Sequence, residues 1–138
     1  MKVLADSCAW SLLFRRKSRA AMNGDEQFVL ASLKEAIRDR RVGIIGAIRQ
    51  EVLSGIKEFA QFQKLRTALQ AFPDEPLATL HYEEAARLFN LCRGRGVECG
   101  STDILICAVA VKMQYDILTY DKGLKRCIHV LRTEGLLR

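Results

Sequence analysis

Apolar residues along this chain follow two alternating patterns. Short continuous apolar runs, typical of buried strands, are separated by longer stretches in which apolar residues recur every three to four positions, as on one face of a helix. The runs that predict strands are 3–4, 42–48, 77–81, 116–121 and 129–133. The stretches that predict helices are 9–16, 25–37, 49–56, 57–72, 82–93 and 101–113, with a short helical turn in KGLKR. Strands therefore alternate with helices along the chain.

Local signals indicate where some of these helices begin. Asn23 and Gly24 form a turn signal, and Asp25 is favoured in the first turn of the helix that follows. Ser101 or Thr102 is expected to cap the helix that runs to about residue 113.

The alternation of strands and helices predicts the fold class. Strand–helix–strand units are right-handed and build a mainly parallel sheet with helices on both faces. We expect an α/β fold with about five strands, and a single domain over residues 1–138, since this length is usual for one domain. Ligands of such sheets bind beyond the carboxyl ends of the strands. Polar residues at those ends are therefore candidates for function.

Four acidic residues are expected at that edge of the sheet. Asp6 and Asp121 each end a predicted strand. Asp103 lies in the first turn of a helix, and Glu51 lies on the helix stripe that faces the core. Carboxylates gathered there repel one another unless a cation neutralises them, and magnesium and manganese prefer such oxygen ligands. Taken singly, each acid also fits a structural cap or turn, and Asp116 is expected at the opposite edge.

The charge balance favours a polyanionic partner. Lys and Arg number 22 against 16 Asp and Glu, which gives a net charge of +6. Arg15, Arg16, Lys122 and Lys125 are the candidates for contacts to a nucleic-acid backbone. Acidic metal ligands beside basic side chains fit the hydrolysis of a phosphodiester.

The cysteines and histidines predict no metal site. The five cysteines form no C-x-x-C pair and are expected to be reduced, mostly buried thiols. His81 and His129 lie in apolar runs and are expected to be structural. The longest apolar run, 104–111, is far shorter than the roughly 20 residues of a membrane span, and no signal-peptide pattern opens the chain. We therefore expect a cytoplasmic protein with no membrane contact.

Four short blocks of this sequence resemble a known family. DSCAW (6–10), EVLSG (51–55), STDILICAVA (101–110) and ILTYD (117–121) are similar to the four acidic blocks of PIN-domain nucleases, and most similar to those of VapC-type toxins. The resemblance implies a three-layer α/β/α fold around a parallel sheet. It also implies a magnesium or manganese site formed by Asp6, Glu51, Asp103 and Asp121.

The resemblance further implies how these residues act. A metal held by Asp6, Asp103 and Glu51 is expected to activate a water, while Asp121 holds a second ion or positions the water. Ser7 and Thr119 match hydroxyl positions of the same blocks, where they would support the ligands. RNA is the implied substrate, cut to 5′-phosphate and 3′-hydroxyl ends.

The similarity to VapC-type toxins also implies partners. Such toxins form homodimers and are neutralised by a small, DNA-binding, VapB-like antitoxin whose tail lies over the active-site groove. Trp10, Leu13 and Phe14 either line an apolar groove for that tail or belong to the core.

Other classes share parts of this pattern. A receiver-like signalling domain requires an acidic pair after the first strand, and a haloacid-type phosphatase requires D-x-D there, whereas this chain has Ala5-Asp6-Ser7 followed by Cys8. A nonenzymatic RNA-binding module of the same fold stays open, although the full set of four acids argues against it. A PIN nuclease of RNA processing without an antitoxin also stays open.

Overall fold

The computed structural model describes residues 1–14 and 21–138, so Arg15 and Arg16 lie outside the described residues. Three strands are present in the described part: β1 (Val3–Ala5), β2 (Val42–Gly43) and β3 (Asp116–Leu118). The helices are α1 (Ser7–Phe14), α2 (Gly24–Arg38), α3 (Gly46–Leu53), α4 (Phe59–Leu69), α5 (Thr79–Gly94), α6 (Ser101–Met113) and α7 (Lys122–Thr133).

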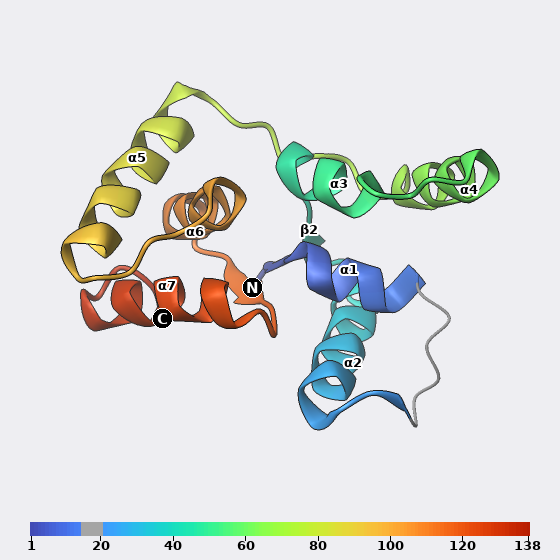
Figure 1. Cartoon of the computed structure of the whole chain (residues 1–138), viewed down its shortest axis with the longest axis horizontal. Coiled ribbons are helices and arrows are strands. Elements are labelled where there is room, and N and C mark those ends of the chain that lie inside the picture. The colour runs from blue at the N-terminus through green and yellow to red at the C-terminus, as the bar shows by residue number, and fades with distance from the viewer. Residues whose placement is uncertain (15–20) are drawn as a thin grey trace.

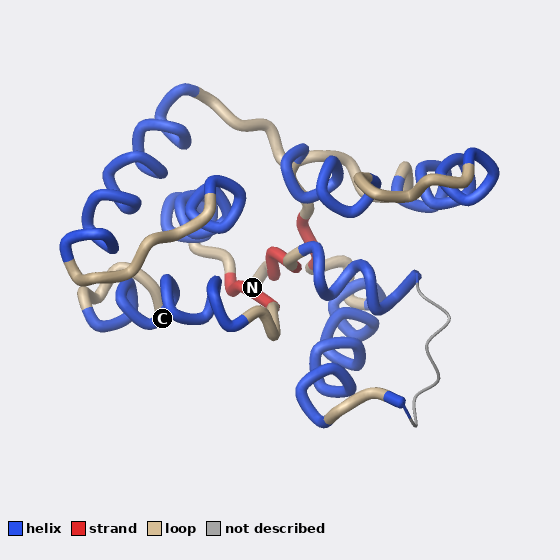
Figure 2. The backbone as a smooth tube through the Cα atoms, viewed as in Figure 1, coloured by secondary structure: helices blue, strands red, loops and turns tan. Residues whose placement is uncertain are grey.

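The sheet is parallel, as predicted, and β1 is its central strand. The strand order is β2-β1-β3, and Val3 pairs with Val42 on one side and Asp116 on the other. The strands lie between two groups of helices, with α5, α6 and α7 on one side and α1 to α4 on the other (Figures 1 and 2). This arrangement is the predicted three-layer α/β/α architecture, and it places the residue after β1 at the centre of the sheet edge.

The sheet is smaller than the five strands predicted from the sequence. Residues 79–81 of the expected strand 77–81 belong to α5, and the expected strand 129–133 is the second half of α7. In α7 the buried side chains Leu124, Cys127, Ile128 and Leu131 recur at helical spacing, so the last apolar run is part of a helix face. A short apolar run has the same composition in a strand and in a buried helix, which explains both errors.

The run 42–48 divides between two states. Only Val42 and Gly43 form a strand, Ile44 adds an isolated bridge to Asp74, and α3 begins at Gly46. The three isoleucines Ile44, Ile45 and Ile48 are fully buried, whereas Val42 and Ala47 are partly buried and Gly46 is exposed. The prediction of burial is therefore confirmed only in part, and the prediction of one strand is wrong.

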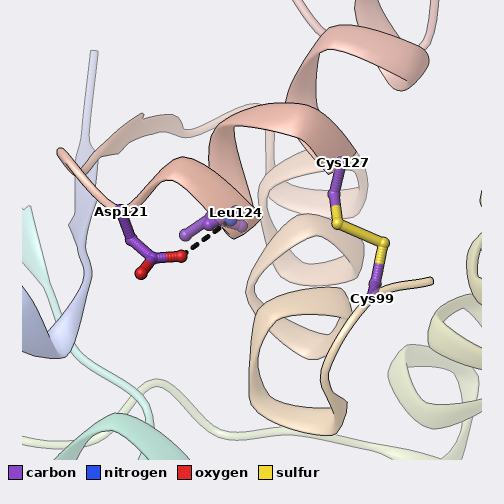
Figure 3. Close-up of a disulfide and its surroundings, with 4 residues drawn as sticks. All are labelled: Cys99, Asp121, Leu124 and Cys127. Carbon is purple, nitrogen blue, oxygen red and sulfur yellow. Dashed lines mark hydrogen bonds between the residues drawn. A yellow bond between two sulfur atoms is a disulfide. The ribbon is translucent and has the colours of Figure 1, made fainter. Parts of the chain in front are cut away.

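Helix caps follow the sequence signals in part. Asn23 caps α2 by accepting a hydrogen bond from the Glu26 N–H at 2.8 Å, and the Glu26 carboxylate accepts from the Asn23 N–H at 3.2 Å. The cap of α6 is Gly100, which makes no side-chain cap, rather than Ser101 or Thr102, which lie in the first turn. Asp121 caps α7 by accepting from the Leu124 N–H at 2.8 Å (Figure 3).

One core cluster joins the two helix groups to the sheet. Seven consecutive residues of α6, Ile104 to Ala110, are buried, and the first six of them belong to this cluster. Trp10 is fully buried and donates its indole N–H to the Ala5 carbonyl at 3.2 Å. Trp10 is therefore a core residue, the second of the two possibilities that the sequence left open, whereas Leu13 and Phe14 are partly buried. Within the described residues no helix has the length and apolar character needed to cross a membrane.

The expectation of five reduced thiols is wrong for two cysteines. Cys99 and Cys127 form a disulfide with their Cα atoms 6.3 Å apart, while Cys8, Cys92 and Cys107 are free (Figure 3). The two bonded residues are 28 positions apart in sequence, and only the packing of α6 against α7 brings them together. No cysteine spacing motif in the sequence predicts that Cys99 pairs with Cys127.

Of the two histidines, His81 has a structural role, as expected. Its Nδ1 accepts a hydrogen bond from the Ala78 N–H at 2.9 Å at the start of α5, and the side chain is buried. His129 lies exposed on α7.

Candidate functional site

Asp6 lies at the carboxyl end of the central strand and is the most enclosed acid of the candidate site. Its N–H donates to the Leu118 carbonyl of β3 at 2.9 Å, and its own carbonyl accepts from the Ala9 N–H at 3.0 Å as α1 begins. The residue is only 3% exposed. Its position is therefore fixed by both the sheet and the helix that follows.

Two hydrogen bonds and one longer contact reach the Asp6 carboxylate. One oxygen accepts from the Ser7 N–H at 2.7 Å and lies 3.4 Å from the Ser7 hydroxyl. The other accepts from the Thr119 hydroxyl at 3.0 Å. Burial raises the pKa of Asp6, and the hydrogen bonds from Ser7 and Thr119 oppose that shift.

The hydroxyls of Ser7 and Thr119 link the acids to one another. Ser7 Oγ also donates to the carboxylate of Glu51 on α3. Thr119 Oγ1 accepts from the Asp121 N–H at 3.0 Å while it donates to Asp6. Each hydroxyl thus contacts Asp6 and a second part of the site. A supporting role for both hydroxyls was what the family resemblance implied.

Asp103 lies in the first turn of α6 and is half-buried. Burial and the negative charges of three neighbours raise its pKa from 3.8 to about 6. The three neighbours, in order of their effect, are Asp6, Asp121 and Glu51. The fold therefore brings Asp103 close enough to the other three predicted acids for their charges to act on it.

The exposure of the acids differs from the prediction at one position. Glu51 is exposed, although Ile48 and Val52 on the same helix are buried. The buried face of α3 therefore includes Val52 but not Glu51, which was expected to face the core. Asp121 is exposed and also caps α7. Asp116 lies at the other end of β3, exposed and away from the site, as predicted.

The donor set of this site suits a hard divalent cation, although no ready-made metal cage is present. Among residues 1–14 and 21–138, no three His, Cys, Asp or Glu side chains are grouped closely enough to hold an ion. None of the ion pairs in that part of the chain engages the four acids: Lys and Arg pair instead with Asp39, Asp74, Glu75, Glu84 and Glu134. The repulsion felt by Asp103 therefore has no counter-charge from the described residues, and oxygen donors in this state fit magnesium or manganese.

The structure adds Cys8 to the surroundings of the site. Its sulfur lies 3.4 Å from Thr119 Oγ1, and burial raises the pKa of its thiol, which keeps the thiol neutral. The only sequence signal for this position of Cys8 is that it follows Ser7 directly. Lys122 and Lys125, two of the predicted backbone contacts, are exposed in the first turns of α7, next to Asp121.

Comparisons with known proteins identify the family and support the fold. The sequence model of the PIN domain family matches residues 3–128. The fold is similar to that of a chain in the crystal structure of FitAcB from Neisseria gonorrhoeae, with a TM-score of 0.70 and 18% identity over 91% of this chain and 93% of that chain. Comparison with curated protein sequences finds no match. A family match over nearly the whole length, together with the three-layer fold, means that the chain belongs to the PIN domain family.

Proposed function

We propose that this chain is a magnesium- or manganese-dependent endoribonuclease that hydrolyses RNA phosphodiester bonds. The observation that carries the proposal is the gathering of four acids at one edge of the sheet: Ser7 links Asp6 to Glu51, Thr119 links Asp6 to the Asp121 N–H, and the charges of these three acids reach Asp103 and help to raise its pKa. Carboxylates gathered in this way destabilise the folded chain unless a cation neutralises them, and a metal site for phosphate chemistry uses them as ligands. The basic net charge of +6 supports a nucleic-acid substrate.

The four acids and two hydroxyls have separate roles in this proposal. Asp6, Glu51 and Asp103 hold the metal, and Asp121 holds a second ion or positions the attacking water. When bound, the ion supplies positive charge for the phosphate and lowers the pKa of its water. Ser7 and Thr119 keep the carboxylates of Asp6 and Glu51 in orientation through the hydrogen bonds described above. Lys122 and Lys125 contact the RNA backbone, as do Arg15 and Arg16.

We further propose that the chain is the toxin of a VapBC-type pair, acting in the cytoplasm as a homodimer and neutralised by a small antitoxin. The support is the resemblance of the four acidic blocks to those of VapC-type toxins, together with the shared PIN fold. The discriminating observation is a neighbouring reading frame that encodes a small DNA-binding protein. If no such protein copurifies and production of the chain alone is harmless to cells, the toxin role is excluded and a nuclease of RNA processing remains.

Cleavage of RNA by the purified chain tests the ribonuclease proposal. We expect cleavage of a structured RNA with magnesium or manganese, no cleavage with EDTA, and a loss of at least a hundredfold in rate for Asp103→Asn, because removal of one ligand charge weakens the metal site. The matched control is Asp116→Asn, which removes a carboxylate from the opposite end of β3 and should leave the rate unchanged. Full activity of Asp103→Asn at equal purity contradicts the site assignment.

A further inference from the structure

A hollow of about 430 Å³ lies between α2, β3 and α7, and Thr119, which contacts Asp6, is one of its lining residues. This volume is within the range of small-ligand sites, about 300 to 1,000 Å³. The lining residues that matter for its chemistry are Asp25, Phe28, Thr119, Lys125, His129 and Arg132.

One wall of the hollow is basic. Lys125, His129 and Arg132 are exposed and follow one another at spacings of four and three, so they lie along a single face of α7. In the described residues none of the three pairs with a side-chain carboxylate. Arg132 Nε donates to the main-chain oxygen of Arg138, which leaves the outer guanidinium nitrogens for another acceptor. The three side chains form a row of donors suited to a phosphate.

The wall formed by α2 carries an aromatic ring that is not part of the hydrophobic core. Phe28 is 68% exposed on α2, whose buried side chains are Val29, Leu33 and Ala36. Within the part of the chain described, no other ring stacks on it. An aromatic face open to water beside a basic row is the combination that binds single-stranded nucleic acid, because bases stack on the ring while cations hold the backbone.

The hollow adjoins the acids through Thr119. The residue lines the hollow, and its hydroxyl donates to Asp6 at 3.0 Å. A ligand in the hollow therefore lies one side chain away from the carboxylate at the centre of the candidate site.

We propose that this hollow binds one nucleotide of single-stranded RNA, with the base against Phe28 and the phosphate on Lys125, His129 and Arg132. The inference rests on the proposed ribonuclease function and names where its substrate lies. Asp25 fixes the orientation, since it lies one helical turn before Phe28 and its carboxylate repels phosphate. That carboxylate can accept a hydrogen bond from the exocyclic amine of cytosine, which uracil lacks, so cytosine is preferred over uracil.

The binding of a labelled oligocytidine in EDTA, where no metal-dependent cleavage occurs, tests the aromatic wall. We expect Phe28→Ala to weaken binding by about 5- to 150-fold, the loss that corresponds to one base–aromatic stack. The matched control is Phe59→Ala on α4, which removes a ring of similar exposure, 74%, outside the hollow and should bind as the parent does. Equal melting temperatures of the two variants show that the fold is kept, as expected for exposed side chains.

Two more variants test the basic wall and the orientation. Lys125→Ala should lower the slope of log affinity against log salt by about 0.7, the value for one phosphate contact to a single strand, whereas the exposed Lys64→Ala on α4 should leave the slope unchanged. Asp25→Asn should abolish the preference for oligocytidine over oligouridine.

The outcomes separate this proposal from the ribonuclease proposal. The nucleotide site is overturned if Phe28→Ala binds the oligonucleotide as Phe59→Ala does, or if Lys125→Ala has the same salt slope as Lys64→Ala. This holds whatever the cleavage assay shows. The nucleotide site is also overturned if an acidic peptide, and not the oligonucleotide, binds in a Phe28-dependent way. Asp103→Asn, in contrast, should lose cleavage in magnesium, while its binding of oligocytidine in EDTA should still weaken when Phe28→Ala is added. If no variant or parent cleaves RNA while Phe28 still controls binding, the nucleotide site stands and the ribonuclease proposal fails.

Discussion

Asp6 and Asp103 carry the same functional group in different surroundings. The Asp6 carboxylate accepts hydrogen bonds from Ser7 and Thr119, and these stabilise its charged form. Asp103 receives no such bond from the described residues, and burial together with three negative neighbours raises its pKa to about 6. Removal of charge is therefore expected to have different consequences at the two positions.

Asp103→Asn should melt at a higher temperature than the parent in EDTA at pH 7. Two unit charges about 4 Å apart repel by roughly 4 kcal/mol at an effective dielectric of about 20, and solvent screening at this half-exposed position reduces the gain in unfolding free energy to about 1 kcal/mol, or roughly 3 °C. Asp6→Asn should gain less or lose stability, because the carboxylate accepts from the Ser7 N–H on one oxygen and from the Thr119 hydroxyl on the other, whereas an amide has a single acceptor oxygen and turns its NH2 group toward one of these donors. Calorimetry of both variants checks this, and a lower melting temperature for Asp103→Asn would show that its carboxylate is a structural cap.

The raised pKa of Asp103 also predicts how stability depends on pH. The folded-state pKa is about 6 and the usual value is 3.8, so between these values the folded chain binds more protons than the unfolded chain. The contribution of Asp103 to unfolding free energy therefore falls as pH rises from about 4 to 6, and the full repulsion is present above pH 6. Melting curves in EDTA across this range should show the parent losing stability relative to Asp103→Asn as the pH rises from about 4 to 6.

At the scale of elements, the disulfide joins the segment before α6 to α7. Cys99 lies four positions before Asp103, and Cys127 lies six positions after Asp121 (Figure 3). The bond therefore connects the two elements that carry two of the four acids. Its absence should affect both stability and the arrangement of those acids.

Removal of this disulfide should lower the melting temperature. For a loop of 28 residues, the loss of the cross-link corresponds to roughly 3 to 4 kcal/mol of unfolding free energy in the chain-entropy description, or roughly 10 °C. Cys99→Ala with Cys127→Ala should melt at that lower temperature with or without a reducing agent, whereas the parent should reach it only after reduction. A parent that melts identically before and after reduction would show that the bond contributes nothing.

At the scale of the whole molecule, bound metal should stabilise the folded chain. At a magnesium concentration about one hundred times the dissociation constant, binding to the folded state adds about 2.7 kcal/mol to the free energy of unfolding. We expect a rise of roughly 8 °C in the melting temperature of the parent and a much smaller rise for Asp103→Asn. Asp116→Asn serves as the control and should keep the full shift, because Asp116 lies at the far end of β3. An equal shift in all three proteins would place the ion elsewhere.

Long amphipathic stretches predicted secondary structure more accurately than short apolar runs did. The long amphipathic stretches were predicted as helices and are helices, as α2 and α4 show. The runs 77–81 and 129–133 failed because such short apolar runs contain too little periodicity to separate a strand from a buried helix turn. The position of Asp6 after the first strand was predicted correctly, since that strand is bounded by polar residues on both sides.

Residue types and their local spacing were sufficient to establish the parallel α/β class, the family resemblance and the order of the four acids along the chain. Three further features required the folded chain: the exposure of Glu51, the pairing of Cys99 with Cys127, and the strength of repulsion at Asp103. Each depends on contacts between segments far apart in the chain. Helix phase, sulfur proximity and electrostatic coupling are set by packing across the sheet edge, and no local pattern of hydrophobic and polar residues encodes them.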